Sequence, residues 1–281
     1  MTSIFLGLGA ALAWGTSDFL GGRFTARLPV FTVSLASHIA ATLLLAATVL
    51  LLRPEIGREA LLWGLTAGLA TSFGGMALYQ GLSLGESAVV APLSACGAVL
   101  PVAAVLLTGE SPGNVALAGM AFAFAGIILV SLPPEGRLFP TGHHLRPVLL
   151  GLAAALAFGL FFLLIGRASS SDGDALVAVL AARFGASLST AAIGRAARGL
   201  RWPGAAGALR LGSIGVVDTA ANLAFALATS RGNVAVASVL GSLYPVQTLL
   251  LARLFTGERF TARRLAGAGF ALAGVAVIAA S

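Results

Sequence analysis

Residues 11–23 read ALAWGTSDFLGGR, and residues 155–167 read ALAFGLFFLLIGR. The two stretches lie 144 positions apart and share an alanine and leucine frame, a central glycine and a final arginine. Both look suited to a hydrocarbon environment, yet Asp18 of the first stretch occupies the position that Phe162 has in the second. This pairing predicts a chain that repeats itself, with a carboxylate in only one of the two copies.

The composition indicates an integral membrane protein. Of 281 residues, 58% are apolar and only 10% are charged, against about 25% charged residues in an average soluble domain. So much apolar sequence cannot be enclosed in one water-soluble core. We therefore predict an all-α multi-pass protein of the cytoplasmic membrane, whose ten transmembrane helices cover about 3–22, 30–52, 60–82, 87–107, 115–132, 147–166, 174–194, 208–229, 234–255 and 264–280. The N-terminal MTS lacks a positive charge, so the first segment is interpreted as a membrane helix and not as a signal peptide.

Other stretches repeat at nearly the same offset. LAGMAFAFAGIIL (117–129) matches LAGAGFALAGVAV (265–277), and ALYQGLSLGESA (77–88) matches AFALATSRGNVA (224–235). The sequence thus predicts two halves, 1–134 and 145–281, with five helices each. Because five is odd, the second half enters the membrane from the opposite side, and the two halves form inverted repeats around a central cavity.

The arginines support this topology. All 17 basic residues are arginine; twelve fall on the loops and helix ends of one expected face, four on the other, and Arg183 lies inside a helix. By the positive-inside rule the twelve-arginine face is cytoplasmic and both termini lie outside. Since the basic residues are explained as topology determinants, we expect no nucleic-acid partner.

Enzyme, metal and cofactor chemistry find no support in the sequence. Cys96 is the single cysteine, which excludes an internal disulfide and a cysteine-based metal site. The chain contains no GxxxxGK[ST] phosphate loop, no HExxH and no GxSxG. We expect a protein that is not an enzyme and that uses no metal or cofactor.

Three stretches together resemble a known family: the ALAWG opening, ALYQGLSLGESAVVAPL (77–93) and YPVQTLLLARLFTGE (244–258). They are similar to the ten-helix EamA branch of the drug/metabolite transporter superfamily, over essentially the whole chain. The resemblance implies a secondary transporter with two inverted five-helix repeats around a cavity. Relatives export amino acids, including aromatic ones, or other metabolites. It also implies an arginine in the second helix of a repeat, which Arg183 supplies and His38 does not.

Arg183 and Asp218 are ionisable residues near the middle of expected membrane helices, where a charge is costly and usually functional. Asp218 lies eight residues beyond Arg210, about 12 Å into its helix. In one interpretation both residues line the cavity, Arg183 binding the carboxylate of a zwitterion and Asp218 its ammonium. In the other they neutralise each other as a buried structural pair. The sequence leaves both open.

Asp18 allows two interpretations as well. It lies five residues before Arg23, about 7 Å from the end of its helix, and in one interpretation it is a carboxylate near the interface that forms a salt bridge to Arg23 or is capped by the loop. Alternatively, it is a gate residue on one side of the cavity. Because the two halves are inverted, Phe162 would then lie near the opposite membrane face, where Phe161 and Phe162 would seal the substrate path through the cavity.

His38 occupies the repeat position of Arg183, at an offset of 145. It either titrates near neutral pH and couples protons, or serves as a hydrogen-bonded packing residue.

Aromatic residues expected to stack on a substrate, or alternatively to pack, are Trp14, Tyr79, Phe158 and Tyr244. Neutral polar residues expected at the cavity are Asn222, one turn after Asp218, and Gln247. Pro92, Pro101 and Pro245 are predicted to bend their helices, as hinges or as static kinks.

These observations favour a secondary transporter that exports small metabolites, most simply amino acids, by alternating access. The alternative is efflux of cationic drugs or other metabolites by proton antiport, which needs an accessible carboxylate among aromatic residues without a compensating arginine. Arg183 argues against this alternative. The expected partners are a small-molecule substrate and the lipid bilayer. The sequence does not decide between a monomer and a dimer.

Overall fold

The computed structural model describes residues 2–84, 87–109, 112–131, 145–172, 174–256 and 262–279, and every regular element within these ranges is a helix. The helices of the first half are α1 (Thr2–Thr25), α2 (Val30–Leu52), α3 (Arg58–Ser83), α4 (Ser87–Ala95), the 3-10 helix η1 (Cys96–Ala98), α5 (Val99–Leu107) and α6 (Asn114–Ser131). Those of the second half are α7 (Leu145–Ser169), α8 (Ala175–Ala196), α9 (Ala205–Ser230), α10 (Val234–Gly241), α11 (Tyr244–Thr256) and α12 (Ala262–Ala279).

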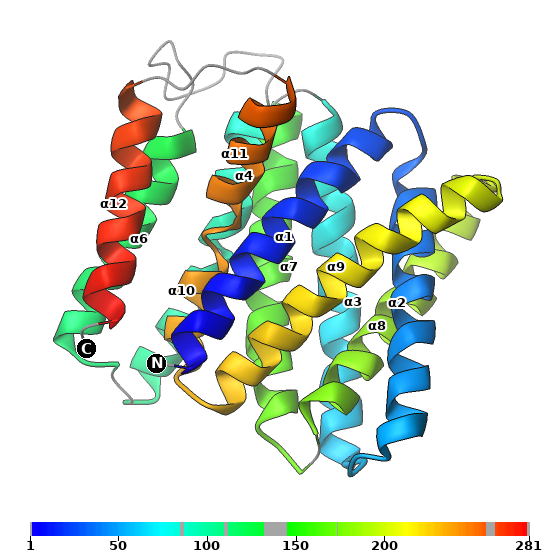
Figure 1. Cartoon of the computed structure of the whole chain (residues 1–281), viewed down its shortest axis with the longest axis horizontal. Coiled ribbons are helices and arrows are strands. Elements are labelled where there is room, and N and C mark those ends of the chain that lie inside the picture. Colours follow the sequence, from blue (N-terminus) through cyan, green and yellow to red (C-terminus); the bar gives the residue numbers. More distant parts are fainter. Residues whose placement is uncertain are drawn as a thin grey trace.

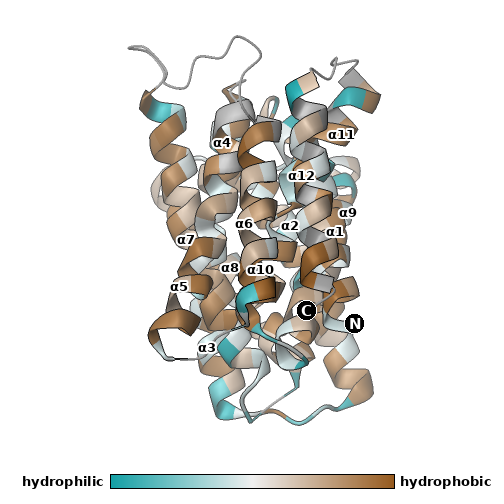
Figure 2. Cartoon of the chain, turned by 90° about the vertical axis from the view of Figure 1, so that its left-hand side faces the viewer, coloured by the Kyte–Doolittle hydropathy of each residue, from teal (hydrophilic) through white to brown (hydrophobic). Residues whose placement is uncertain are grey.

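The long helices have the length and hydropathy of membrane spans. The helices α1, α2, α3, α7, α8 and α9 each run for 22 to 26 residues, and α10 and α11 together form a further apolar stretch. Large apolar side chains are freely exposed, among them Leu51 and Leu107 at 82% and 88%. Figure 2 shows hydrophobic residues along the helices and hydrophilic ones mainly near their ends. This distribution suits a chain solvated by lipid and confirms the predicted all-α membrane protein.

The two crossings that carry the predicted proline hinges are both interrupted. In the first half, η1 separates α4 from α5 and lies between Pro92 and Pro101. In the second half, a turn at residues 242–243 separates α10 from α11, and Pro245 is the second residue of α11. A proline fits the first turn of a helix because an N–H there has no acceptor within the helix. The breaks are therefore structural facts, while movement at them stays a prediction.

The bundle is held together mainly by contacts between the two halves (Figure 1). The helix α3 packs against α7 and α8, and α1 packs against α9 and α11. The helices α6 and α12 pack on each other at one edge of the bundle, where the backbone at Gly119 comes close to Gly274. The helices that remain in the middle are the ones that can enclose a cavity.

Two glycines mark helix crossings too close for any side chain. A Cβ on Gly68 of α3 would overlap the carbonyl oxygen of Ala182 in α8. A Cβ on Gly215 of α9 would overlap the carbonyl oxygen of Ser37 in α2. Gly215 lies 147 residues after Gly68, and Ala182 lies 145 residues after Ser37. The same contact is thus made twice, with the roles of the halves exchanged.

Both ends of the described chain, at Thr2 and Ala279, lie at the same face of the bundle, which we call the terminus face (Figure 1). Arginines at or near the helix ends of this face are Arg53, Arg58, Arg167 and Arg231. The opposite face, which we call the arginine face, carries Arg23, Arg27, Arg146, Arg195, Arg198, Arg201, Arg210, Arg253 and Arg263. The described residues therefore reproduce the expected separation of the arginines.

At the terminus face, Asp172 ties the α7–α8 connection to the start of α3. Its carboxylate accepts hydrogen bonds from the backbone N–H of Ala60 (3.2 Å) and of Glu59 (3.4 Å). Desolvation raises the pKa of the Asp172 carboxyl, but hydrogen bonds from the backbone, foremost from Ala60, lower it by more in sum. The pKa consequently lies below its ordinary value of 3.8, and the ionised form caps the helix.

We expect Asp172→Ala to lower the melting temperature of the purified protein at pH 7. Because the folded-state pKa is depressed, the stabilisation is complete above pH 3.8 and is lost as the pH falls through the folded-state value. The measurement is thermal unfolding in detergent between pH 7 and pH 3, with Glu59→Gln at an exposed position as the control. A difference in melting temperature that stays constant over this range would contradict the capping role.

Candidate functional site

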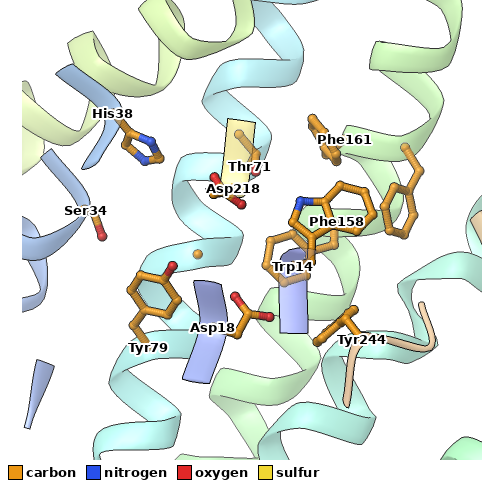
Figure 3. Close-up of a pocket in the computed structure, with 12 residues that line it drawn as sticks. Trp14, Asp18, Ser34, His38, Thr71, Tyr79, Phe158, Phe161, Asp218 and Tyr244 are labelled. Atoms are coloured by element: carbon orange, nitrogen blue, oxygen red, sulfur yellow. The ribbon is translucent and has the colours of Figure 1, made fainter. Parts of the chain in front are cut away.

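A cavity lies in the middle of the bundle, among α1, α2, α3, α7, α9 and α11. It measures about 550 Å³ when its open mouth is included. It is lined by Trp14, Asp18, Ser34, His38, Thr71, Gly75, Tyr79, Phe158, Phe161, Phe162, Asp218 and Tyr244. In Figure 3, Ser34, His38 and Tyr79 lie toward one side, Phe158, Phe161 and Tyr244 lie toward the other, and the two aspartates lie between them. One wall can hydrogen-bond, and the other can contact an apolar or aromatic group.

Aromatic rings gather on the side of the cavity nearer the terminus face. Trp14, Phe161, Phe162 and Phe225 are all buried, and the ring of Phe225 lies 4.9 Å from that of Phe162 and 5.4 Å from that of Trp14. Phe162 is 17 residues beyond the start of α7 at the arginine face, or about 26 Å along the helix. Asp18 is only seven residues from the end of α1 at that face, about 10 Å. We call the four rings the aromatic seal.

Asp18 contributes a carboxylate without a protein partner. The residue is 8% exposed and lines the cavity. No hydrogen bond or ion pair joins its carboxylate to another residue in the described part of the chain. Arg23, the neighbour that a salt bridge would require, instead lies over the ring of Phe19 at 5.6 Å. The carboxylate is therefore available to a ligand.

Arg183 lies behind the cavity wall and not in it. Its side chain is 1% exposed, and Nη1 lies 2.6 Å from Asp218 Oδ2. Nη2 donates to the backbone oxygen of Asp218 at 3.1 Å, and Nη1 also faces His38 Nδ1 at 3.4 Å. Asp218, with its side chain 20% exposed, separates the guanidinium from the cavity. This geometry matches the buried structural pair, one of the two interpretations of the sequence.

Two further residues expected at the cavity point elsewhere. Asn222 Nδ2 donates to the backbone oxygen of Asp218 at 2.6 Å, so that it supports the position of that residue. Gln247 Nε2 lies 3.4 Å from Thr16 Oγ1, which links α11 to α1.

Tyr244 does line the cavity, and its hydroxyl hydrogen-bonds with Ser94 of α4. The structure thus brings together Trp14, Asp18, His38, Tyr79, Phe158, Asp218 and Tyr244 at the cavity.

Three lining residues were missed by reasoning from the sequence, although the repeat could have found two of them. Thr71 lies 147 positions before Asp218, and Gly75 lies 147 positions before Asn222. Ser34 lies one helical turn before His38 and so shares its face of α2. Glycine, serine and threonine are common in membrane helices and do not by themselves indicate a cavity. These three residues could be identified only from their spacing, by the repeat offset or by one helical turn, to a polar residue that was already a candidate.

Comparison with known proteins agrees with this architecture. The model of the EamA-like transporter family matches residues 1–132 and again residues 145–280. A solved structure titled only "Crystal structure of protein" resembles the chain with a TM-score of 0.75 at 19% sequence identity, over 98% of this chain and 95% of the other. At that identity the likeness concerns the fold alone. Among curated proteins, none matches the chain.

The two family matches together leave only the connection between the halves and the last residue uncovered. The cavity at the centre of a lipid-exposed helical bundle fits what this family name describes. The chain therefore belongs to the EamA-like transporter family, within the drug/metabolite transporter superfamily, and is a membrane transporter.

Proposed function

We propose that the protein is a secondary transporter that exports small amine-bearing molecules across the cytoplasmic membrane. The observation that carries this proposal is the free carboxylate of Asp18, buried among aromatic residues at the cavity. An ammonium group would form a charge-assisted hydrogen bond with it, and Trp14 and Tyr79 would offer ring faces to the same cation.

The balance of charge supports a cation over a zwitterion. The amino-acid hypothesis assigned the substrate carboxylate to Arg183, but this guanidinium is engaged by Asp218. Once that pair is neutralised, Asp18 in its ionised form leaves one net negative charge among the described residues that line the cavity. A monovalent cation neutralises it, whereas a zwitterion leaves it uncompensated in a medium where uncompensated charge is costly. The balance of charge therefore favours cationic substrates, with amino acids as the competing class.

Alternating access between two inverted halves, 1–134 and 145–281, is part of the proposal. It is supported by the exchanged contacts of Gly68 and Gly215 and by the aromatic cluster on the side of the cavity nearer the terminus face. If the arginine face is cytoplasmic, a substrate reaches Asp18 from the cell interior. A proton and an ammonium compete for the same carboxylate, and this competition is the simplest route to exchange of one for the other.

Replacing Asp18 by Asn is expected to reduce transport of small amines by roughly 10- to 150-fold, the range that corresponds to a lost hydrogen bond to a charged group. The measurement is uptake of radiolabelled 2-phenylethylamine and of amino acids into proteoliposomes, with and without a pH gradient. Asp18→Glu keeps the charge, and Glu59→Gln removes a carboxylate outside the cavity; both are controls.

Two outcomes would decide against parts of this proposal. Undiminished amine flux in Asp18→Asn would exclude this carboxylate as the binding group. Saturable flux of amino acids without flux of any amine would return the assignment to amino-acid export.

A further inference from the structure

We propose that Ser34 and His38 form a hydrogen-bond donor site for an uncharged acceptor group on the substrate, such as a hydroxyl or a carbonyl. This inference rests on the proposed function, because it adds a second anchor to a molecule whose ammonium is bound by Asp18. It narrows the substrate class to monovalent amines that carry a neutral acceptor and an apolar or aromatic body.

The tautomer of His38 follows from its neighbour. A guanidinium has only donors, so Nδ1 of His38, which faces Arg183 Nη1 at 3.4 Å, must be the acceptor of this pair. The ring proton is therefore on Nε2. No other hydrogen bond of this ring is found among the described residues, which leaves the Nε2 proton for a ligand at the cavity that His38 lines.

Ser34 supplies an independent observation. Its side chain is 3% exposed, and its hydroxyl has no hydrogen-bond partner in the described part of the chain. Ser37 of the same helix shows the ordinary arrangement, with a hydroxyl that bonds the backbone oxygens of Val33 and Leu211 at 2.9 Å each. A buried hydroxyl without a partner costs stability. That cost is offset when a ligand supplies the missing partner.

The two donors act on the same part of the cavity. Ser34 and His38 lie one turn apart on α2, and both side chains extend from this helix toward the cavity (Figure 3). Asp18 lies on α1, and Phe158 and Phe161 lie on α7 across the cavity. A substrate could thus place its ammonium at Asp18, its acceptor at α2 and its ring against α7.

The net charge selects the kind of acceptor. Both donors are uncharged, and the guanidinium of Arg183 is already neutralised by Asp218. A carboxylate at this position would bring a second uncompensated negative charge next to the cavity's own. A hydroxyl or carbonyl group satisfies the donors at no such cost.

Three compounds that differ at one carbon test the site: 2-phenylethylamine, phenylalaninol and phenylalanine carry a hydrogen, a hydroxymethyl group and a carboxylate there. We expect the purified protein to bind phenylalaninol about tenfold more tightly than 2-phenylethylamine, as two added neutral hydrogen bonds allow, and to bind phenylalanine most weakly. In Ser34→Ala and in His38→Leu the tenfold ratio should fall toward one. His38→Gln, which keeps a donor, should retain part of it.

Stability separates a binding role from a structural one. Ser34→Ala removes no hydrogen bond of the empty protein, so its melting temperature without ligand should not fall, whereas Ser37→Ala should lower it. Equal binding of both amines, or a ratio unchanged in Ser34→Ala and His38→Leu, would overturn the donor site and leave Asp18 as the amine site. Tightest binding of phenylalanine would overturn the neutral acceptor. If neither amine binds, the proposed function fails, and this inference fails with it.

Discussion

Asp218→Ala is expected to destabilise the folded protein by about 3–5 kcal/mol, because it leaves the Arg183 guanidinium buried without its counter-charge. With 1% of its side chain exposed, Arg183 cannot turn toward water without moving α8. Its remaining contacts would be the backbone oxygen of residue 218 and the Nδ1 atom of His38. Thermal unfolding in detergent measures the loss.

The double variant Arg183→Met/Asp218→Leu provides the matched control. Removing both charges together is often neutral or stabilising, so the double variant should recover most of the stability that Asp218→Ala loses. If the double variant is as unstable as the single one, the pair contributes through specific hydrogen bonds and not through mutual neutralisation. If Asp218→Ala is as stable as the wild type, the guanidinium is better solvated than its burial indicates.

Phe162→Ala should open a leak through the aromatic seal. Phe162 is 3% exposed, and its ring lies 4.9 Å from Phe225 and 5.8 Å from both Trp14 and Phe161. Truncating a buried phenylalanine typically costs about 3–5 kcal/mol, since the cavity left behind is not refilled. In proteoliposomes we expect faster dissipation of an imposed pH gradient in the absence of substrate.

A second pair of rings supplies the control for that prediction. Phe122 and Phe270 stack at 6.0 Å on α6 and α12, and Phe122 is 44% exposed toward the surrounding lipid. Phe122→Ala should therefore leave the pH gradient intact. A leak of equal size in both variants would mean that general loosening, and not the seal, is responsible.

The fold was largely predictable, because membrane insertion leaves few alternatives to apolar helices. The segments expected at 30–52 and 208–229 correspond to α2 at Val30–Leu52 and α9 at Ala205–Ser230. What the sequence could not show was the internal break of two crossings. Proline positions bracketed the break at Cys96, but the turn at residues 242–243 depends on packing that no local signal specifies.

The residues around the cavity were predictable only in part, because Arg183, Asn222 and Gln247 do not line it, whereas Ser34, Thr71 and Gly75 do. The orientation of the side chains was not predictable. Reasoning from the sequence identified Arg183 and Asp218 as central, yet it could not tell which of them faced the cavity, since both occupy similar depths. Which of the two side chains faces the cavity depends on how α8 and α9 are rotated about their axes relative to each other. Likewise, the distance of Asp18 from its helix end suggested an interfacial salt bridge. Because α1 is surrounded by α9 and α11 and lies near α3, this depth is protein interior instead.

The position of the two chain ends has a practical consequence. Because Thr2 and Ala279 lie at one face, two copies could be joined in tandem through a soluble linker that never crosses the bilayer. Such a fusion allows one copy to be inactivated while its covalent neighbour stays intact. Half of the normal flux would then indicate that each copy works alone, whereas complete loss would indicate that copies operate in concert.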